Sequence, residues 1–361
     1  MKLLGGADEG TSMDRLIYGF LGIVVVIGVW HLLTAGILFE PGFFPTPFKV
    51  LKSIPELFGD NELLKNIGFS LGLNISGYLE AILIVIPLGF LVGLIKYARW
   101  GFQRQVDALR YVPLTAVTIL FILLFGTEVP MKVHFLAFGI MIYLLPVMIQ
   151  RIDEVGDVYL KTVHTLGASD WQVLKTVYMP SVLSRLSDDI RVLTAISWTY
   201  IIVAEGVNSN QGGIGTLIYF VGQRQSRYDK VFALVIVIMI IGMLQDKIFV
   251  WLDREFFPYK YQAKESIKSS RIGNAGVFGG IFDFTILALG WILIGIYFIL
   301  MINEFVPFLG EFRPLQYLFG QTAWVFHILF ILLLLYKAWK WNHTRIDQLA
   351  LKSLTVKPVG K

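Results

Sequence analysis

The chain has 361 residues, of which 56% are hydrophobic and only 16% charged, and its formal net charge is +5. A soluble globular protein carries roughly 25% charged residues, and the apolar residues here gather in runs of about 20, enough to cross a bilayer core of about 30 Å. The composition therefore excludes an ordinary soluble fold and predicts an all-α polytopic membrane protein. No nucleic-acid partner is expected, because the basic residues lie in loops between apolar runs.

Eight membrane spans are predicted, at residues 16–38, 70–95, 108–126, 131–150, 188–204, 231–252, 281–302 and 315–336. The first is too long for a signal-peptide core and no clear cleavage site follows it, so we expect a retained helix. The third contains Pro113 near its start and the fifth opens with Asp188, Asp189 and Arg191. Both are therefore expected inside a helix bundle rather than in contact with lipid.

The orientation follows from the Lys and Arg residues of the short loops. With both termini in the cytoplasm, inner loops hold basic residues over outer loops at roughly three to one, as the positive-inside rule requires. A shift in composition then divides the chain into a core at 1–258 with a cytoplasmic loop at 151–187, a linker at 259–280, a transmembrane hairpin at 281–341 and a cytoplasmic tail at 342–361.

The loop between the fourth and fifth spans forms a polar elbow. Residues 152–165 mix polar and apolar positions at helical spacing, as in an amphipathic helix on a surface. Gly167 then permits a turn, and Ser169-x-x-Gln172 is a capping box that starts a second helix. Pro180 disfavours helical backbone at Met179, so this second helix is expected to end there. The elbow would present Trp171 either to a soluble partner or, in the alternative interpretation, to lipid headgroups.

The same elbow resembles the cytoplasmic loop of ABC-importer membrane subunits. In that family a Gly is followed by nine residues and Ile-x-Leu-Pro; here Gly167 is followed by nine residues and Val177-Tyr178-Met179-Pro180. Lys161-Thr162-Val163 replaces the family's Glu-Ala-Ala, so the salt bridge of that glutamate is not expected. Over about residues 30–258 the chain resembles the nitrate/sulfonate/taurine/bicarbonate branch, through ordered motifs that include Phe44-Pro45-Thr46-Pro47, Pro87-Leu88-Gly89 and Gly212-Gly213-Ile214-Gly215.

The resemblance implies a six-helix permease core in the inner membrane of a prokaryote, with the hairpin as an addition. It implies a transport subunit rather than an enzyme, working with a second copy of itself, two ATP-binding subunits that carry ATP and Mg, and an extracytoplasmic solute-binding protein that delivers a small anion. The chain has no G-x-x-x-x-G-K-[ST] loop, so ATP hydrolysis is expected in another chain. The coupling contact would comprise Gly167, Ala168, Ser169, Asp170, Trp171 and Leu174.

Polar residues inside the spans are candidates for the translocation pathway: Asn74, Glu80, Thr115, Thr118, Ser197, Trp198 and Tyr200. The alternative for each is a hydrogen bond or ion pair to a neighbouring helix. Glu205, Gly212 and Gly213 belong to a polar outer loop that could form a gate, dock the binding protein or be an ordinary flexible loop. No buried Lys or Arg is expected, and five scattered histidines without an accompanying carboxylate cluster predict no metal site and no cofactor in this chain.

Two other functions stay open at this level. An ATP-independent secondary transporter or channel could use Glu80 and the polar fifth span to handle ions, although no clear inverted repeat supports it. A non-transporting membrane scaffold is the third alternative. Asp188, Asp189 and Arg191 are expected to form salt bridges beside the elbow.

Overall fold

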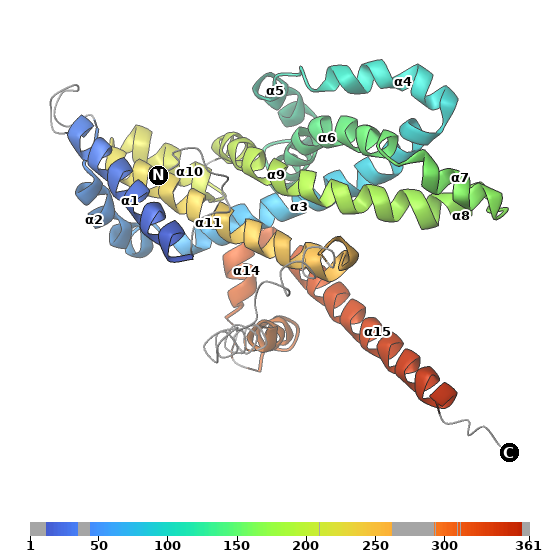
Figure 1. The fold of residues 1–361 in the computed structure, drawn as a ribbon. Coiled ribbons are helices and arrows are strands. Elements are labelled where there is room, and N and C mark those ends of the chain that lie inside the picture. Colours follow the sequence, from blue (N-terminus) through green and yellow to red (C-terminus); the bar gives the residue numbers. More distant parts are fainter. Residues whose placement is uncertain are drawn as a thin grey trace.

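A computed structural model describes residues 12–34, 44–208, 210–261, 292, 294–308, 310 and 312–355. The described residues form helices joined by short turns, so the predicted all-α class is confirmed (Figure 1). The first part of the chain supplies α1 (Ser12–Leu32), α2 (Pro47–Gly59), α3 (Leu63–Leu94), α4 (Lys96–Leu109), α5 (Leu114–Phe125) and α6 (Val129–Asp153). The rest supplies α7 (Asp157–Thr165), α8 (Asp170–Val173), α9 (Met179–Gly206), α10 (Ile214–Tyr219), α11 (Tyr228–Phe256), the helix Ile294–Phe305, α14 (Pro314–Phe319) and α15 (Ala323–Thr355).

Four described segments are long and apolar enough to cross a membrane: Leu63–Leu94, Val129–Asp153, Tyr228–Phe256 and Pro314–Asn342. The pair α4–α5 is a fifth candidate if two helices bent by 107° count as one span. Shorter apolar helices, Ile17–Leu32 and Ile294–Phe305, lie in the predicted first and seventh spans. Residues 281–291 of the predicted seventh span lie outside the described residues.

The structure corrects the predicted third span, which was expected as one helix over 108–126. Helix α4 ends at Leu109, α5 begins at Leu114, and the two meet at a sharp bend. Pro113 explains the break, because it lacks a backbone N–H and disfavours helical backbone at Val112. Alone, the 12 residues of α5 extend only about 18 Å. Helix α9, by contrast, is longer than the predicted fifth span: it begins at Met179, well before the predicted start at 188.

The core of the bundle is α3 packed along α6, with α9 packed against both helices. The two helices approach closely at Gly77, where an added Cβ would lie 2.7 Å from the Cβ of Leu136. One apolar cluster around Leu136, Trp198 and Ile201 fills the end near α2 and α10, and a second around Leu144 and Met148 fills the end near α7. This packing fixes the relative positions of the helices that carry the candidate sites.

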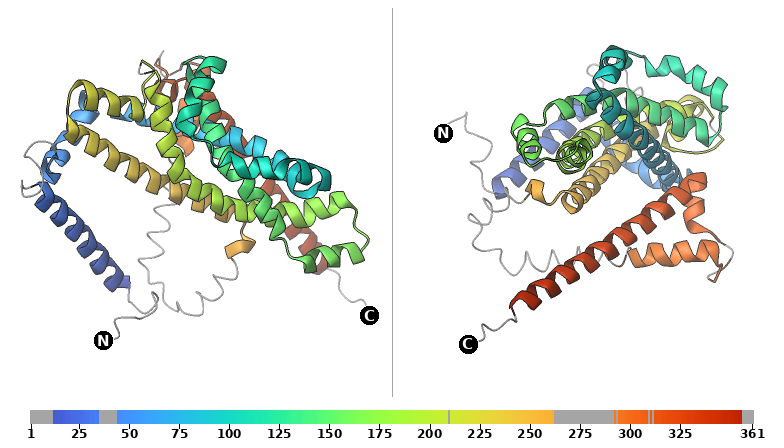
Figure 2. Two further views of the ribbon diagram at one scale, coloured as in Figure 1. Left: turned by 90° about the horizontal axis from the view of Figure 1, so that it is seen from above. Right: turned by 90° about the vertical axis from the view of Figure 1, so that its right-hand side faces the viewer.

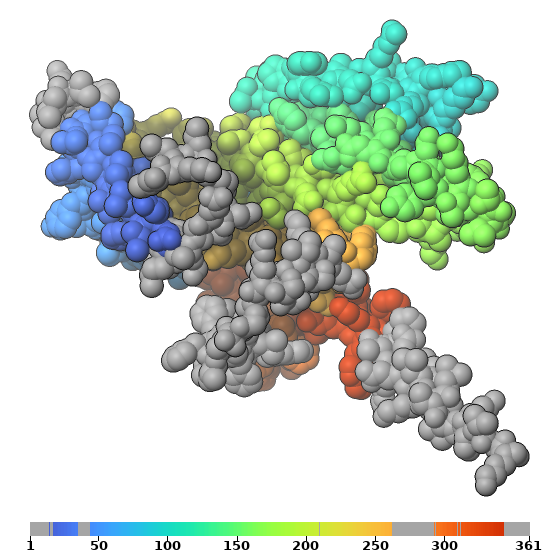
Figure 3. All heavy atoms as spheres, in the orientation of Figure 1, coloured from blue at the N-terminus to red at the C-terminus, as the bar shows by residue number. Residues whose placement is uncertain are grey.

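Two parts of the molecule stand apart from this bundle. Helix α15 extends away from it in Figure 1 and in the right view of Figure 2, and it continues beyond 341 to Thr355, into the predicted tail. The elbow formed by α7 and α8 is one tip of the molecule, at the opposite end from α1 and α2 (Figure 3). The elbow is therefore open to contact from outside the chain.

Candidate functional site

The elbow between α6 and α9 has the local geometry that the sequence predicts. Gly167 adopts a φ of +76°, which a residue with a side chain rarely takes, and so reverses the chain after α7. The backbone N–H of Ser169 donates to Oε1 of Gln172 at 2.8 Å, as the predicted capping box requires. Gly167 and Ser169 thus start α8 at a defined angle to α7.

The prediction that Pro180 ends the second helix is wrong. Met179 has helical backbone, with φ −57° and ψ −53°, and its N–H donates to the carbonyl of Leu174. A π-helical turn at Leu174–Tyr178 connects α8 to α9, so the position where proline lacks an N–H falls in the first turn of α9. Helix α8, the π-helical turn and the long helix α9 therefore form one continuous helical rod.

The outer surface of the elbow carries large apolar side chains. Trp171 is 69% exposed and Leu166 81% exposed, and Val158 and Tyr159 on α7 are also exposed. Of the predicted coupling residues, Gly167, Ser169, Asp170 and Trp171 are exposed, whereas Ala168 and Leu174 are half-buried. Exposed apolar side chains that cluster on a polar segment are typical of a surface that another protein covers.

A group of ion pairs, here called the clasp, lies beneath the elbow. The guanidinium of Arg151 donates to both carboxylate oxygens of Asp189 at 2.8 Å each and to those of Glu154 at 3.0 and 2.8 Å. Arg185 also reaches Glu154, at 3.3 Å. The hydrogen bond from Arg151 lowers the pKa of the Glu154 carboxyl below its ordinary value. The clasp ties the end of α6 to α9.

The salt bridges predicted for the start of the fifth span are confirmed. Besides the Asp189 pair, Lys260 lies 2.8 Å from Asp188, and Arg191 lies 2.9 Å from Asp246 on α11. The sequence did not identify Arg151 as the partner of Asp189, because the two lie 38 residues apart along the chain.

Three of the predicted pathway residues lie in a buried hydrogen-bonded cluster. Asn74 donates to Ser197 at 2.9 Å, Gln245 donates to Asn74 at 3.3 Å, and Trp198 donates to Gln245 at 3.0 Å. These bonds join α3, α9 and α11, which is the interhelical arrangement given as the alternative. Gln245 was missed, although a lone amide in an apolar run is a visible signal.

Glu80 also has a partner on a neighbouring helix. Its carboxylate lies 2.7 Å from Nδ1 of His134 on α6. His327 forms a second such pair, with Glu304 at 2.8 Å. Within the described residues, no group of three or more His, Asp or Glu side chains could hold a metal ion.

The outer loop that follows α9 is held by Glu205, whose side chain is fully buried. Its carboxylate accepts hydrogen bonds from the Ser70 hydroxyl and from the Gly215 N–H, both at 2.6 Å. Gly212 and Gly213 have positive φ, and a Cβ on Gly213 would lie 2.3 Å from Cδ of Glu205. Glu205 thus organises the loop from inside, at the N-terminus of α10.

A buried cation beside this loop was not expected. Lys132 was assigned to an outer loop, but its side chain lies inside the protein in α6 with no exposed surface. Its ammonium donates to the carbonyl of Asn208 at 3.3 Å and lies 5.6 Å from the ring centre of Phe69. The expectation that no basic residue is buried is therefore wrong.

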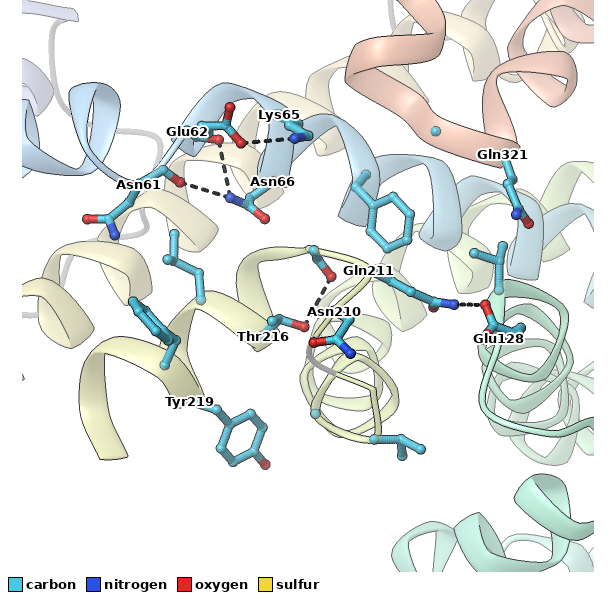
Figure 4. A pocket seen from close by; sticks show the side chains of 18 of the residues that line it. Asn61, Glu62, Lys65, Asn66, Glu128, Asn210, Gln211, Thr216, Tyr219 and Gln321 are labelled. Carbon is cyan, nitrogen blue, oxygen red and sulfur yellow. Dashed lines mark hydrogen bonds and ion pairs between the residues drawn. The ribbon is translucent and has the colours of Figure 1, made fainter. Parts of the chain in front are cut away.

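A cavity of about 1310 Å³ opens at the same end of the molecule. Its walls come from the α2–α3 turn, the outer loop, α5 and α14; they include the predicted residues Thr115, Thr118 and Gly212. Figure 4 shows Asn66, Asn210, Gln211, Glu128 and Gln321 around it, with Gln211 hydrogen-bonded to Glu128. Tyr200 and Thr115 line a smaller cavity of about 330 Å³. Asn74, Ser197 and Trp198 lie outside both.

Comparison of the sequence with known families identifies one match. The family described as "Binding-protein-dependent transport system inner membrane component" matches residues 70–257. The aliphatic sulfonates transport permease protein SsuC of Bacillus subtilis is 27% identical over 245 residues, covering 67% of this chain and 87% of that protein. The taurine transport system permease protein TauC of Escherichia coli is 26% identical over 242 residues, with 66% and 87% covered. A chain of a bacterial ABC transporter that imports alginate has a TM-score of 0.48 at 15% identity, with 67% of this chain and 96% of that chain covered.

Proposed function

This chain belongs to the family of binding-protein-dependent transport system inner membrane components, and on that premise we propose that its elbow is the site where a separate ATP-binding subunit drives solute import. The chain is the membrane-spanning permease of such a system.

One observation carries the proposal: helix α8 of the exposed elbow continues into α9 as one helical rod. Trp171 and Leu166 protrude at the tip, the π-helical turn joins α8 to α9, and the clasp around Arg151 ties α9 to α6. A force applied at the tip by closure of an ATP-binding subunit would tilt α9 rather than bend a loop. Tilting preserves the backbone hydrogen bonds that helices in a membrane need.

We further propose the topology and assembly that fit this mechanism. Eight spans with both termini in the cytoplasm place the elbow inside the cell and the large cavity outside. Two copies of the chain would line one pathway and meet two ATP-binding subunits, which bind ATP and Mg, while an extracytoplasmic binding protein delivers solute to the cavity. Glu205, Gly212 and Gly213 would shape the outer gate between them.

The solute we propose is a small anion with an oxyanion head group. The sulfonate and taurine permeases named above support this class.

A second candidate function has one observation in its favour. The Glu80–His134 pair lies within two apolar helices, and an ionisable pair at such a depth could bind an ion in an ATP-independent secondary transporter or channel. Solute uptake by the purified chain in vesicles without ATP, abolished in Glu80→Gln, would favour this function over the first.

The main proposal is tested by Trp171→Ala in the assembled complex. Trp171 is 69% exposed, so its loss should leave the fold and assembly intact while stimulated ATP hydrolysis and uptake both fall. Trp324→Ala is the matched control, because Trp324 is 61% exposed on α15, far from the elbow. Wild-type ATPase and uptake in an assembled Trp171→Ala complex would refute the assignment.

A further inference from the structure

The C-terminal hairpin, which comprises Ile294–Phe305, α14 and α15, lies outside the family match at residues 70–257. It nevertheless packs tightly on α3 of the core. A Cβ added at Gly68 would lie 2.5 Å from the carbonyl oxygen of Leu318, and one at Gly72 would lie 1.9 Å from Oγ1 of Thr322. Small residues four apart permit this kind of close backbone contact between membrane helices. The hairpin thus packs at a specific site on the core.

The start of α14 is also fixed by polar contacts from two sides. Within the hairpin, Glu304 accepts from the backbone N–H of Gln316 at 2.5 Å, and Asn303 donates to the carbonyl of Phe312 at 3.1 Å. Across to the core, the hydroxyl of Tyr317 donates to Glu62 at 3.0 Å. These bonds hold the segment 312–322 in one position relative to α3.

That position makes the hairpin one wall of the large outer cavity. The hairpin contributes Gln316, Tyr317, Leu318, Gly320 and Gln321, opposite core residues such as Glu128 and Gln211. In Figure 4, Gln321 lies across from the Gln211–Glu128 pair. A segment that only shielded α3 from lipid would not need to place two glutamine side chains beside water-accessible space.

Three carboxyl groups, of Asp60, Glu62 and Glu128, and two cations, Lys65 and Arg224, line this cavity. Glu62 is paired with Lys65 at 2.9 Å, and Glu128 accepts from Gln211. On the far wall Arg224 forms no salt bridge with any described carboxylate, and its guanidinium lies over the ring of Phe220. The amides of Gln316 and Gln321 each add two N–H donors.

We propose that the C-terminal hairpin lines the large outer cavity as part of the solute pathway, where the amides of Gln316 and Gln321 donate hydrogen bonds to a small oxyanion that enters the pathway. This rests on the proposed function for the class of solute. The neutral amides suit a transient site, because a neutral donor holds an anion less tightly than a cation does and so allows its release.

The first experiment uses the absence of cysteine from the chain. Gln321→Cys creates a single thiol, which should react from outside with the membrane-impermeant anionic reagent methanethiosulfonate ethylsulfonate, and the reaction should reduce ATP-driven uptake several-fold. Leu332→Cys is the control, since Leu332 is 55% exposed on the same hairpin but in its apolar span; it should stay unlabelled. No labelling at 321, or labelling without any loss of uptake, would overturn the proposal.

The second experiment tests the contact between the hairpin and α3 by adding one methyl group to α3 at Gly72. Gly72→Ala should reduce uptake several-fold because its Cβ meets Thr322, whereas Gly242→Ala, with nothing within 4 Å, should not. Adding Thr322→Gly leaves the carbonyl oxygen of Phe319, at 3.5 Å, as the nearest neighbour and should restore uptake. Wild-type uptake by Gly72→Ala, with unchanged reactivity at position 321, would contradict a functional role for the contact between Gly72 and Thr322. A wild-type complex without ATP-driven uptake would instead refute the proposed function, while the labelling contrast still decides whether the hairpin faces water.

Discussion

Replacing Arg151 with Met tests whether the clasp beneath the elbow holds α6 and α9 together. The substitution keeps an apolar stem of similar length but removes the guanidinium that binds both oxygens of Asp189 and both oxygens of Glu154. Only Arg185, 3.3 Å from Glu154, would remain to compensate the two carboxylates. The two carboxylates would then repel each other across the gap.

The magnitude follows from the partial burial of these side chains. Fully exposed ion pairs contribute about 0–1 kcal/mol, and removing one partner of a buried pair costs about 3–5 kcal/mol. The side chain of Arg151 is 27% exposed and that of Asp189 18% exposed, so we expect an intermediate loss of about 2 kcal/mol in the free energy of unfolding. For a chain of this size that corresponds to a fall of about 4–8 °C in Tm at most.

Thermal unfolding of the purified chain in detergent measures the loss, and uptake per ATP hydrolysed in the complex measures coupling. Arg110→Met is the control, because Arg110 pairs with Asp107 at 3.1 Å while both side chains are about half exposed. It should lower Tm by less than about a quarter as much. Equal Tm values for the two variants, or an unchanged uptake-to-ATP ratio in Arg151→Met, would refute the role of the clasp.

Three further predictions concern single residues. The pKa of Glu154 lies below its ordinary value of 4.5, so its contribution to stability is present above that pH and is lost as pH falls through the lowered pKa; Glu154→Gln should flatten the pH dependence of Tm below pH 5. Glu205→Gln replaces an acceptor with a donor beside Ser70 or the Gly215 N–H and should cost about 1–3 kcal/mol in thermal unfolding. Gly167→Ala meets no atom within 4 Å, so only the strain at positive φ of about 1–2 kcal/mol remains; Tm should fall by at most about 4–8 °C, and stimulated ATPase should fall as well.

The features that the sequence predicted correctly depend on short separations along the chain. The turn at Gly167 follows from one residue, and the cap of α8 follows from Ser169 and Gln172, three positions apart. The all-α class follows from the length of the apolar runs. Each of these is decided by local backbone chemistry or by the bilayer thickness, so no knowledge of the tertiary structure is needed.

The features that the sequence missed depend on contacts across the bundle. Gln245 bonds to Asn74 from a distance of 171 residues, and a lone polar residue does not reveal its partner. Lys132 stands near the start of an apolar run, where burial beneath Asn208 cannot be distinguished from exposure in a loop. The π-helical turn before Pro180 is a non-standard bonding pattern, so the usual rule for residues before proline gave the wrong helix end.

The most direct measurement is a cryo-EM map of this chain assembled with its ATP-binding subunits. We expect density for residues 167–176 inserted into a groove of the ATP-binding subunit, with the Trp171 side chain buried at the contact. A map in which that segment lies flat against phospholipid, with no ATP-binding subunit at the elbow, would contradict it.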